Sequence, residues 1–390
     1  MIRVFALLFL IFALAAPSAV KAQLPLPVPQ VPGVGDVVTQ AGQIGNQVER
    51  PLQDLRRTQV RDLLREHRRE LEADPGGMPI VRSQILALGM SEAALATARA
   101  QGFEVVRSDA IDVGTAMVTL RAPAGISTRR ALRRLREADP QGVYDFDHLH
   151  LESGVALTIS GFAQSGAGNG PRIGLVDSGV NASVRVAEQR AFATEQPVAG
   201  PHGTTIAGLI SGAAPGARIY AADIYGGAPT GGAASALARA LAWLAAEDVA
   251  VINVSLVGPR NRVVEAVVAR MVARGFVIVA AVGNDGPAAA PLFPASYDGV
   301  VGVTGVDARD RVLVEAGRGA QVDFAAIGVQ GRARGTSYAA PIVAARIAAR
   351  LTAPGASAAQ SAISAVRSDA RDLGARGRDD IYGYGLISGP

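Results

Sequence analysis

Four polar residues in the second half of the chain could together perform acyl transfer. They are Asp177, His202, Asn284 and Ser337. His202 is the only histidine after residue 150, so it is the candidate there for acid–base chemistry near neutral pH. A carboxylate can orient such an imidazole, which can then take the proton of an attacking serine hydroxyl. Taken singly, each residue could equally be a structural histidine, a helix cap or a turn residue.

These residues stand where a strand or a helix is expected to begin or end. Asp177 ends one apolar run, and Asn284 comes shortly after another. His202 and Ser337 stand at the start of probable helices. A serine at a helix N-terminus lies beside free backbone N–H groups that can stabilise an oxyanion. An asparagine amide can supply a further donor.

The elements that must position these residues alternate along the chain. Short β-branched runs predict strands at 172–176, 218–222, 249–254, 276–282 and 300–303. Alanine-rich stretches predict helices at 202–211, 233–246, 263–274 and 336–351. This alternation predicts an α/β domain with a doubly wound, mainly parallel sheet. Ligands of such sheets bind beyond the carboxyl ends of the strands, where the four polar residues fall.

A smaller domain is expected over residues 78–150. Strands are predicted at 82–88, 103–106, 115–120 and 142–146, and helices at 91–101 and 127–139. The order strand-helix-strand-strand-helix-strand is that of a small α+β, ferredoxin-like domain. The segment that follows, 155–170, is rich in Gly, Ser and Ala, as linkers are.

The N-terminus has the composition of an export sequence. Arg3 precedes the apolar run 4–15, and Val20-Lys21-Ala22 offers small residues for cleavage, so residues 1–22 are interpreted as a signal peptide. An uncleaved membrane anchor is the alternative, although the run is short for a bilayer span. We therefore expect an exported protein, periplasmic or extracellular, without stable membrane insertion after cleavage.

Residues 23–77 form a separate stretch of biased composition. Alternating prolines at 23–32 indicate an extended linker, and 48–71 is helical in character and rich in Arg with interspersed acids. A solvated helix is the simpler interpretation of 48–71, and a membrane-surface helix the alternative.

Charge and composition exclude several classes of function. The net charge is only +4 and is spread over the chain, which gives no reason to expect a nucleic-acid partner. The absence of cysteine excludes disulfides, thiolate metal sites and a cysteine nucleophile. We expect a monomer without a cofactor or a bound metal.

Several motifs together resemble the subtilisin-like serine peptidases, or subtilases. The match runs over about residues 170–386, and the order Asp, His, Ser is that of the subtilisins. The motifs surround the acid (173–179), the base (202–204 with Ala207 and Gly208), the oxyanion residue (Ala281, Gly283, Asn284, Gly286) and the nucleophile (335–337 with Ala339 and Pro341); residues 251–256, 377–380 and 382–385 also match.

The resemblance implies a secreted serine endopeptidase that is made as a self-processing zymogen. It implies a catalytic domain at 171–390 that acts on protein or peptide substrates. Residues 78–150 would be a prodomain that aids folding and inhibits the enzyme, and 151–170 a processing linker. Asp177, His202, Ser337 and Asn284 would be catalytic, and substrate would bind along Ser255, Leu256, Val257 and Gly283.

The chain departs from the family pattern at five positions. The family usually has His, Met, Ser and His where this chain has Thr205, Tyr338, Ala340 and Ile342, and Gly where it has Val257. Val257 could narrow the primary specificity pocket or shift the strand that pairs with substrate, and we therefore expect a preference for small or medium apolar residues. The stretch between the base and residue 218 is short and lacks acids, so no tight calcium site is expected there.

Two alternatives stay open at this point. The chain could be a catalytically silent, subtilisin-like protein that binds peptides, or a maturation protease with one dedicated substrate.

Overall fold

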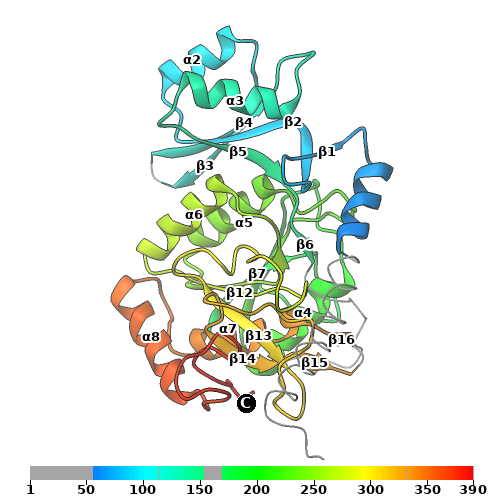
Figure 1. The fold of residues 1–390 in the computed structure, drawn as a ribbon. Helices are drawn as coiled ribbons and strands as arrows, with labels where there is room; N and C mark the ends of the chain where they lie inside the picture. The colour runs from blue at the N-terminus through cyan, green and yellow to red at the C-terminus, as the bar shows by residue number, and fades with distance from the viewer. Residues whose placement is uncertain (1–55, 113, 153–168, 332, 390) are drawn as a thin grey trace, which may run out of the picture. The chain divides into compact units, whose positions relative to one another are not determined.

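The computed structural model describes residues 56–112, 114–152, 169–331 and 333–389 (Figure 1). All of them belong to one compact unit, Ile44–Pro390. The expected signal peptide at 1–22 and the proline-rich stretch at 23–32 lie outside the described residues. Within the described ranges, no helix combines the length and the hydropathy needed to cross a bilayer.

A seven-stranded sheet, in which all the pairings are parallel, forms the centre of the larger part. The strand order is β14-β13-β12-β10-β7-β9-β8. The bounds are β7 Arg172–Asp177, β8 Glu188–Ala191, β9 Arg218–Asp223, β10 Val251–Val254, β12 Val277–Ala281, β13 Val301–Val306 and β14 Phe324–Ile327. The expected parallel α/β sheet is confirmed, and the two edge strands β8 and β14 were not expected.

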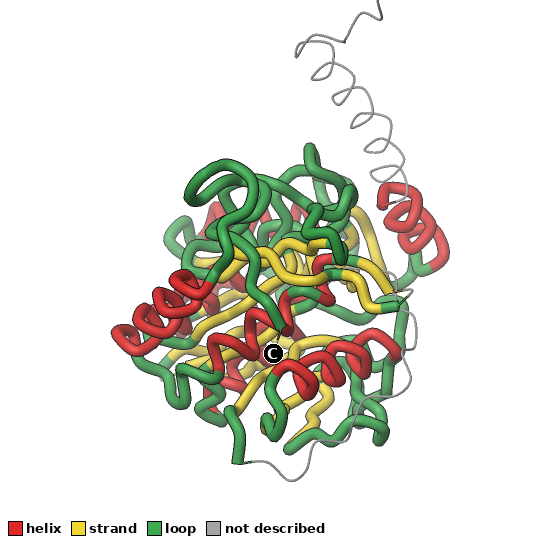
Figure 2. Tube along the Cα trace, turned by 90° about the horizontal axis from the view of Figure 1, so that it is seen from below, coloured by secondary structure: helices red, strands yellow, loops and turns green. Residues whose placement is uncertain are grey.

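Helices cover both faces of this sheet (Figure 2). Neighbouring residues of a strand point to opposite faces, so Leu175 packs in one core and Val176 in the other. One face carries α5 Ala234–Ala246 and α6 Arg262–Ala273; the other carries α4 Pro201–Ala213, α7 Ala340–Ala348 and α8 Ala356–Asp369. The helix expected at 336–351 is in fact the short η1 Thr336–Tyr338 followed by α7, and α8 was not expected.

The smaller part has the predicted order of strands and helices. Its elements are β2 Pro79–Leu88, α2 Glu92–Ala100, β3 Glu104–Asp112, β4 Thr115–Arg121, α3 Thr128–Ala138 and β5 Val143–His148, and its strand pairs are antiparallel. Ser91 and Ser127 cap the two helices, each accepting a hydrogen bond from a backbone N–H of the first turn.

Both faces of β2 are buried, whereas the edge strand β3 is mostly exposed. Along β2, Ile85 and Ala87 pack into the core that includes residues of α2 and α3. Leu86 and Leu88 point the other way, into the core that includes residues of α5 and α6. The smaller sheet therefore lies between two pairs of helices, one pair its own and the other belonging to the larger part (Figure 1).

The stretch expected to be helical at 48–71 does not end as predicted. Among the described residues the helix runs from 56 to 66, and β1 (Leu71–Ala73) then pairs antiparallel with the start of β2. Asp74 closes the turn between β1 and β2 by accepting from the N–H of Met78 at 2.8 Å. Leu71 is fully buried in this arrangement, so tertiary packing outweighs the helical pattern of the local sequence.

Candidate active site

The predicted site residues converge at the carboxyl ends of three adjacent strands. Asp177 is the last residue of β7, Ser255 directly follows β10, and Asn284 comes shortly after β12. Because β7, β10 and β12 are parallel neighbours, these ends meet at one edge of the sheet. His202 lies in the first turn of α4, and Ser337 lies in η1.

Asp177, His202 and Ser337 are hydrogen-bonded in series. The Nδ1 atom of His202 lies 2.8 and 2.9 Å from the two carboxylate oxygens of Asp177. Its Nε2 atom lies 3.1 Å from Oγ of Ser337. All three residues are buried. In this arrangement the carboxylate holds the proton on Nδ1, which leaves Nε2 to accept the proton of the serine hydroxyl.

Ser178 joins the acid to the helix that carries the base. Its N–H donates to Oδ1 of Asp177 at 2.7 Å, and its hydroxyl oxygen accepts from the N–H of Gly203 at 3.0 Å. A Cβ atom on residue 203 would lie 2.0 Å from the carbonyl oxygen of Ser178. Only glycine permits this approach of α4 to β7, which sets the distance between Asp177 and His202.

The backbone around Ser337 is held by a buried polar chain. The amide of Asn253 donates to the hydroxyl of Ser255 at 2.8 Å, and that hydroxyl donates to the carbonyl of Ser337 at 3.1 Å. Gly335, at φ 149°, makes the turn into η1 in a backbone region that favours glycine. Ser255 therefore has a supporting role beyond its predicted place on the substrate strand.

Tyr338, one of the departures from the family pattern, packs against the candidate base. Its ring centroid lies 5.8 Å from that of His202, with an interplanar angle of 60°. Burial, followed by the negative charge of Asp177, raises the pKa of Tyr338 to about 12. The side chain therefore stays neutral over the ordinary pH range, and its ring packs beside the imidazole of His202.

The orientation of the Asn284 amide is set by the segment that carries the serine. Its Oδ1 accepts from the N–H of Thr336 at 2.9 Å, and the hydroxyl oxygen of Thr336 accepts from the N–H of Gly283 at 3.2 Å. With Oδ1 identified as an acceptor, the donor group of this amide is Nδ2. Asn284 is thereby linked by one hydrogen bond to the residue that precedes Ser337.

The predicted substrate strand is paired with residues of the chain itself. β11 (Leu256–Val257) pairs antiparallel with β6 (Leu151–Glu152), which follows the smaller domain. Val257 lies opposite Leu151, and Leu256 lies opposite Glu152. Residues 151–152 thus occupy the edge of β11 where a peptide is predicted to add as a strand, and the preceding residues 149–150 bond to Ala233 and Gly232.

Glu152 reaches the triad, which the sequence analysis did not predict. Ligand atoms of Glu152, Asp177 and His202 all lie within 4.8 Å of one another. Burial, and then the charge of Asp177, raises the pKa of the Glu152 carboxyl. These three residues could hold a metal ion, but a cation there would compete with the hydrogen bond between His202 and Asp177. No local motif around Glu152 could have indicated this position.

His150, two residues before Glu152, is fully buried. Its N–H donates to the carbonyl of Gly232 at 2.7 Å, and its carbonyl accepts from the hydroxyl of Tyr225 at 3.1 Å. A Cβ atom on Gly258 would lie 2.6 Å from the imidazole ring, so glycine there makes room for the ring. Neither ring nitrogen has a hydrogen-bond partner among the described residues.

The comparisons with known proteins agree on one family. Residues 168–385 match the model described as the subtilase family. The chain is 30% identical over 206 residues to the minor extracellular protease Epr of Bacillus subtilis (strain 168), and this match covers 48% of the present chain and 32% of Epr. It is 29% identical over 255 residues to subtilisin DY of Bacillus licheniformis, and this match covers 58% of the present chain and 92% of subtilisin DY.

A solved structure shows the same fold at lower identity. Fervidolysin from Fervidobacterium pennivorans, described as a keratinolytic enzyme related to subtilisin, aligns with a TM-score of 0.64 and 17% identity over 82% of this chain and 61% of its own. Among the curated relatives, the region matched by this chain corresponds to about a third of the length of Epr and to nearly all of subtilisin DY. With a family match over more than half of its length, this chain belongs to the subtilase family of serine endopeptidases.

Proposed function

We propose that the chain hydrolyses peptide bonds with Ser337 as nucleophile, His202 as general base and Asp177 as the residue that orients the base. The observation that carries the proposal is the hydrogen-bonded series from Asp177 through His202 to Ser337. The family membership gives the same reaction class.

The proposed reaction proceeds through an acyl-enzyme. His202 takes the proton of Ser337 as the hydroxyl oxygen attacks the carbonyl carbon of the substrate. Nδ2 of Asn284 and the backbone N–H of Ser337 stabilise the oxyanion. His202 then protonates the leaving amine, and a water molecule that it activates releases the acyl group. The substrate pairs with Leu256 and Val257 as an added strand.

We further propose that residues 78–150 act as a prodomain within an exported zymogen, with cleavage between His150 and Pro171. Two carboxylates of β5 support this proposal. Asp147 accepts from the N–H and the hydroxyl of Ser235 at the start of α5, at 2.9 and 2.7 Å. Asp145 accepts from the N–H of Arg262 at the start of α6, at 2.7 Å. Carboxylates at helix N-termini stabilise such docking.

The proposed function is tested by labelling the unmutated chain. After refolding, the chain is treated with a serine-directed fluorophosphonate, and the labelled peptide is identified by mass spectrometry. We expect a single label on Ser337 and shortening of the chain within 150–171. A folded chain that neither labels nor shortens would favour the catalytically silent peptide-binding protein.

Substitution of Asn284 by aspartate should slow self-shortening by about 10²–10³-fold, a magnitude measured on subtilisin itself rather than calculated for this chain. Aspartate retains an oxygen that can accept from Thr336, but it lacks the Nδ2 donor and adds a negative charge beside the oxyanion. The measurement is the first-order rate of shortening after refolding. An unchanged rate would remove Asn284 from the mechanism.

Docking of the segment 149–152 should weaken in mild acid. Burial, and then the charge of His148, lowers the pKa of His150 to about 3. A free histidine titrates near pH 6.5, so the docked, neutral form is fully favoured above about pH 6.5 and loses stability as the pH falls below it. Hydrogen exchange of the His150 N–H, corrected for intrinsic rates, should accelerate between pH 7 and 5.

The control for this experiment is His150→Phe, which retains a flat ring without a titrating group. Both chains would carry Ser337→Ala so that they stay intact. The phenylalanine chain should show no extra acceleration. Equal acceleration in the two chains would contradict the role of His150.

A further inference from the structure

The helix 56–66 and the strand β1 precede the smaller domain, and neither has a part in the proposed mechanism. The strand is held firmly by the smaller domain. Nη2 of Arg82 donates to the carbonyl of Leu71 at 2.8 Å, and Nη2 of Arg129 donates to the carbonyl of Ala73 at 2.8 Å. The helix is therefore joined to an anchored strand, and its own contacts decide whether it stays in place.

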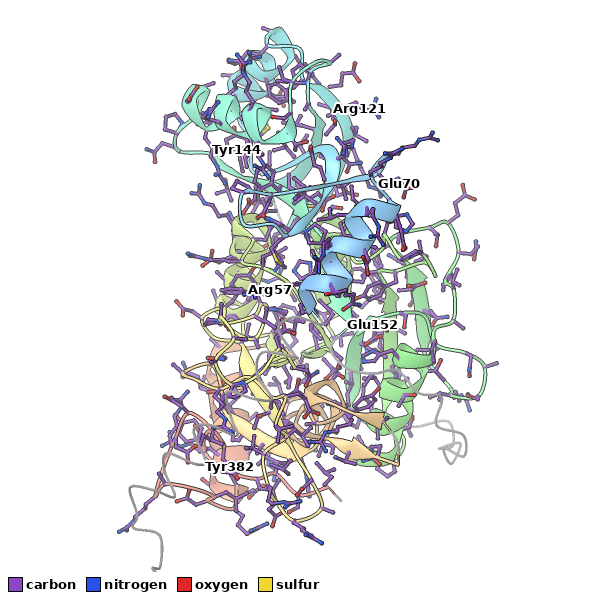
Figure 3. All side chains as sticks on the ribbon, turned by 45° about the vertical axis from the view of Figure 1, so that its right-hand side comes forward. Arg57, Glu70, Arg121, Tyr144, Glu152 and Tyr382 are labelled. Atoms are coloured by element: carbon purple, nitrogen blue, oxygen red, sulfur yellow. The ribbon has the colours of Figure 1, made fainter. Side chains whose placement is uncertain are left out.

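The helix itself has few buried contacts. Val60 is the one buried residue within 56–66, and a mostly exposed turn at 67–70 joins the helix to β1. Segments with so few buried contacts open at a low cost in free energy. In Figures 1 and 3 the start of the helix lies beside β6, and Figure 3 labels Arg57 in the helix and Glu152 in β6.

An ion pair holds the start of the helix on the larger part of the molecule. Nε of Arg56 lies 3.8 Å from Oδ2 of Asp285, and the two side chains are only 14% and 18% exposed. Within the described residues, Nε and Nη2 of Arg56 have no hydrogen-bond partner. The pair therefore lacks the two parallel hydrogen bonds that a guanidinium can form with a carboxylate, and it can separate without breaking them.

Arg56 lies close to the segment 149–152 and to the wall that this segment contacts. Burial is the main cause of the lowered pKa of His150, and the charge of Arg56 adds to it. Burial raises the pKa of Tyr225, and the charge of Arg56 opposes that shift. Because the Tyr225 hydroxyl donates to the carbonyl of His150, Arg56 acts on both partners of one docking contact.

A cavity of about 790 Å³ separates the helix from the larger part. Val60 and Leu64 of the helix line one side of it, and Leu292 lines the other. The next residue, Phe293, exchanges backbone hydrogen bonds with Gly258, which follows β11. The helix thus covers the ground beside β11 without filling it, so that its opening exposes little apolar surface that is now closely packed.

We propose that the helix 56–66 is a flap over the docked segment 149–152, held closed by the ion pair between Arg56 and Asp285, and that the closed flap delays release of the smaller domain after self-processing. The delay rests on the proposed function, whereas closure itself needs no hydrolysis. Opening about the turn 67–70 separates the two charges and uncovers β6, while β1 stays paired with β2.

Hydrogen exchange in the intact chain with Ser337→Ala tests closure without hydrolysis. At pH 7 the further change Arg56→Gln should accelerate exchange of the His150 N–H by about fivefold, as for a partly exposed ion pair. Glutamine keeps the helix propensity of arginine and removes its charge. Arg65→Gln is the matched control, because Arg65 lies on the same helix with its side chain 72% exposed, and this chain should exchange at the starting rate.

A charge swap separates the ion pair from a general effect on the helix. Arg56→Asp alone should accelerate exchange of the His150 N–H further, because two carboxylates then repel each other. Adding Asp285→Arg should bring the rate back towards that of the starting chain. Equal rates in Arg56→Gln and Arg65→Gln would overturn the flap, and so would a swapped chain that exchanges as fast as Arg56→Asp.

The second test follows the chain with Ser337 intact. Arg56→Gln should shorten, by about fivefold, the interval between self-shortening and the first hydrolysis of an added fluorogenic peptide, and Arg65→Gln should not. Equal intervals in the two variants and the unmutated chain would overturn the proposed delay. A chain that never shortens counts against the proposed function, and the flap is then decided by hydrogen exchange.

Discussion

Replacement of Ser337 by alanine should abolish self-shortening and fluorophosphonate labelling together. The hydroxyl is the atom that forms the acyl-enzyme, and its Oγ lies 3.1 Å from the imidazole that would activate it. In subtilisin, a relative of this chain, loss of the equivalent hydroxyl lowers kcat by about 10⁶-fold, and we carry that magnitude over. The measurement is the amount of intact chain over days after refolding.

The matched control is Ser368→Ala, which removes an exposed hydroxyl that donates only to the carbonyl of Ser364 one helical turn earlier. This chain should shorten at the unmutated rate. The Ser337→Ala chain should also be cut when active enzyme is added, which shows that its processing segment is accessible. Shortening of Ser337→Ala by itself, in the absence of other proteases, would rule out Ser337 as the nucleophile.

Asp177→Asn should slow self-shortening by about 10⁴-fold without unfolding the chain. The side-chain oxygen of asparagine can still accept from the N–H of Ser178. The carboxylate offers two oxygens to Nδ1 of His202, whereas the amide offers one oxygen and an NH₂ group that cannot accept. The imidazole then favours the tautomer with its proton on Nε2, where it cannot take the serine proton. The rate of shortening is compared with that of the unmutated chain under identical refolding conditions.

Asp248→Asn makes the same chemical change at an exposed residue with φ 51°, a backbone conformation that asparagine tolerates. It should leave the rate unchanged. Circular dichroism of both variants checks that they fold. A rate within tenfold of the unmutated chain in Asp177→Asn would show that the carboxylate does not orient the base.

The approach of Asp177, His202 and Ser337 to one another could be predicted from the sequence because each of them lies in a short local motif at the end of a predictable element. β7 is a continuous apolar run, and a parallel sheet requires its carboxyl end to meet those of β10 and β12. The structure has Asp177 at the end of β7 and Asn284 shortly after β12, which are the positions that the pattern predicts. The same reasoning found the order of the smaller domain, since serine caps and turns mark its helices.

The contacts of Glu152 and His150 could not be predicted in this way. They come from segments outside the catalytic motifs, and they reach the site only through tertiary pairing, such as that of β6 with β11. The strand β1 was missed for a related reason. Its sequence is helical in character, and only its partner in β2 makes it extended.

The burial of the face of β2 and β4 that meets the larger part should make maturation proceed in one direction. If residues 78–150 detach as proposed, Leu86, Leu88 and Met117 lose their cover from the larger part and meet water. The freed fragment would then be poorly stable and readily degraded by the enzyme that it had restrained. Its destruction would prevent rebinding, so that maturation would be irreversible.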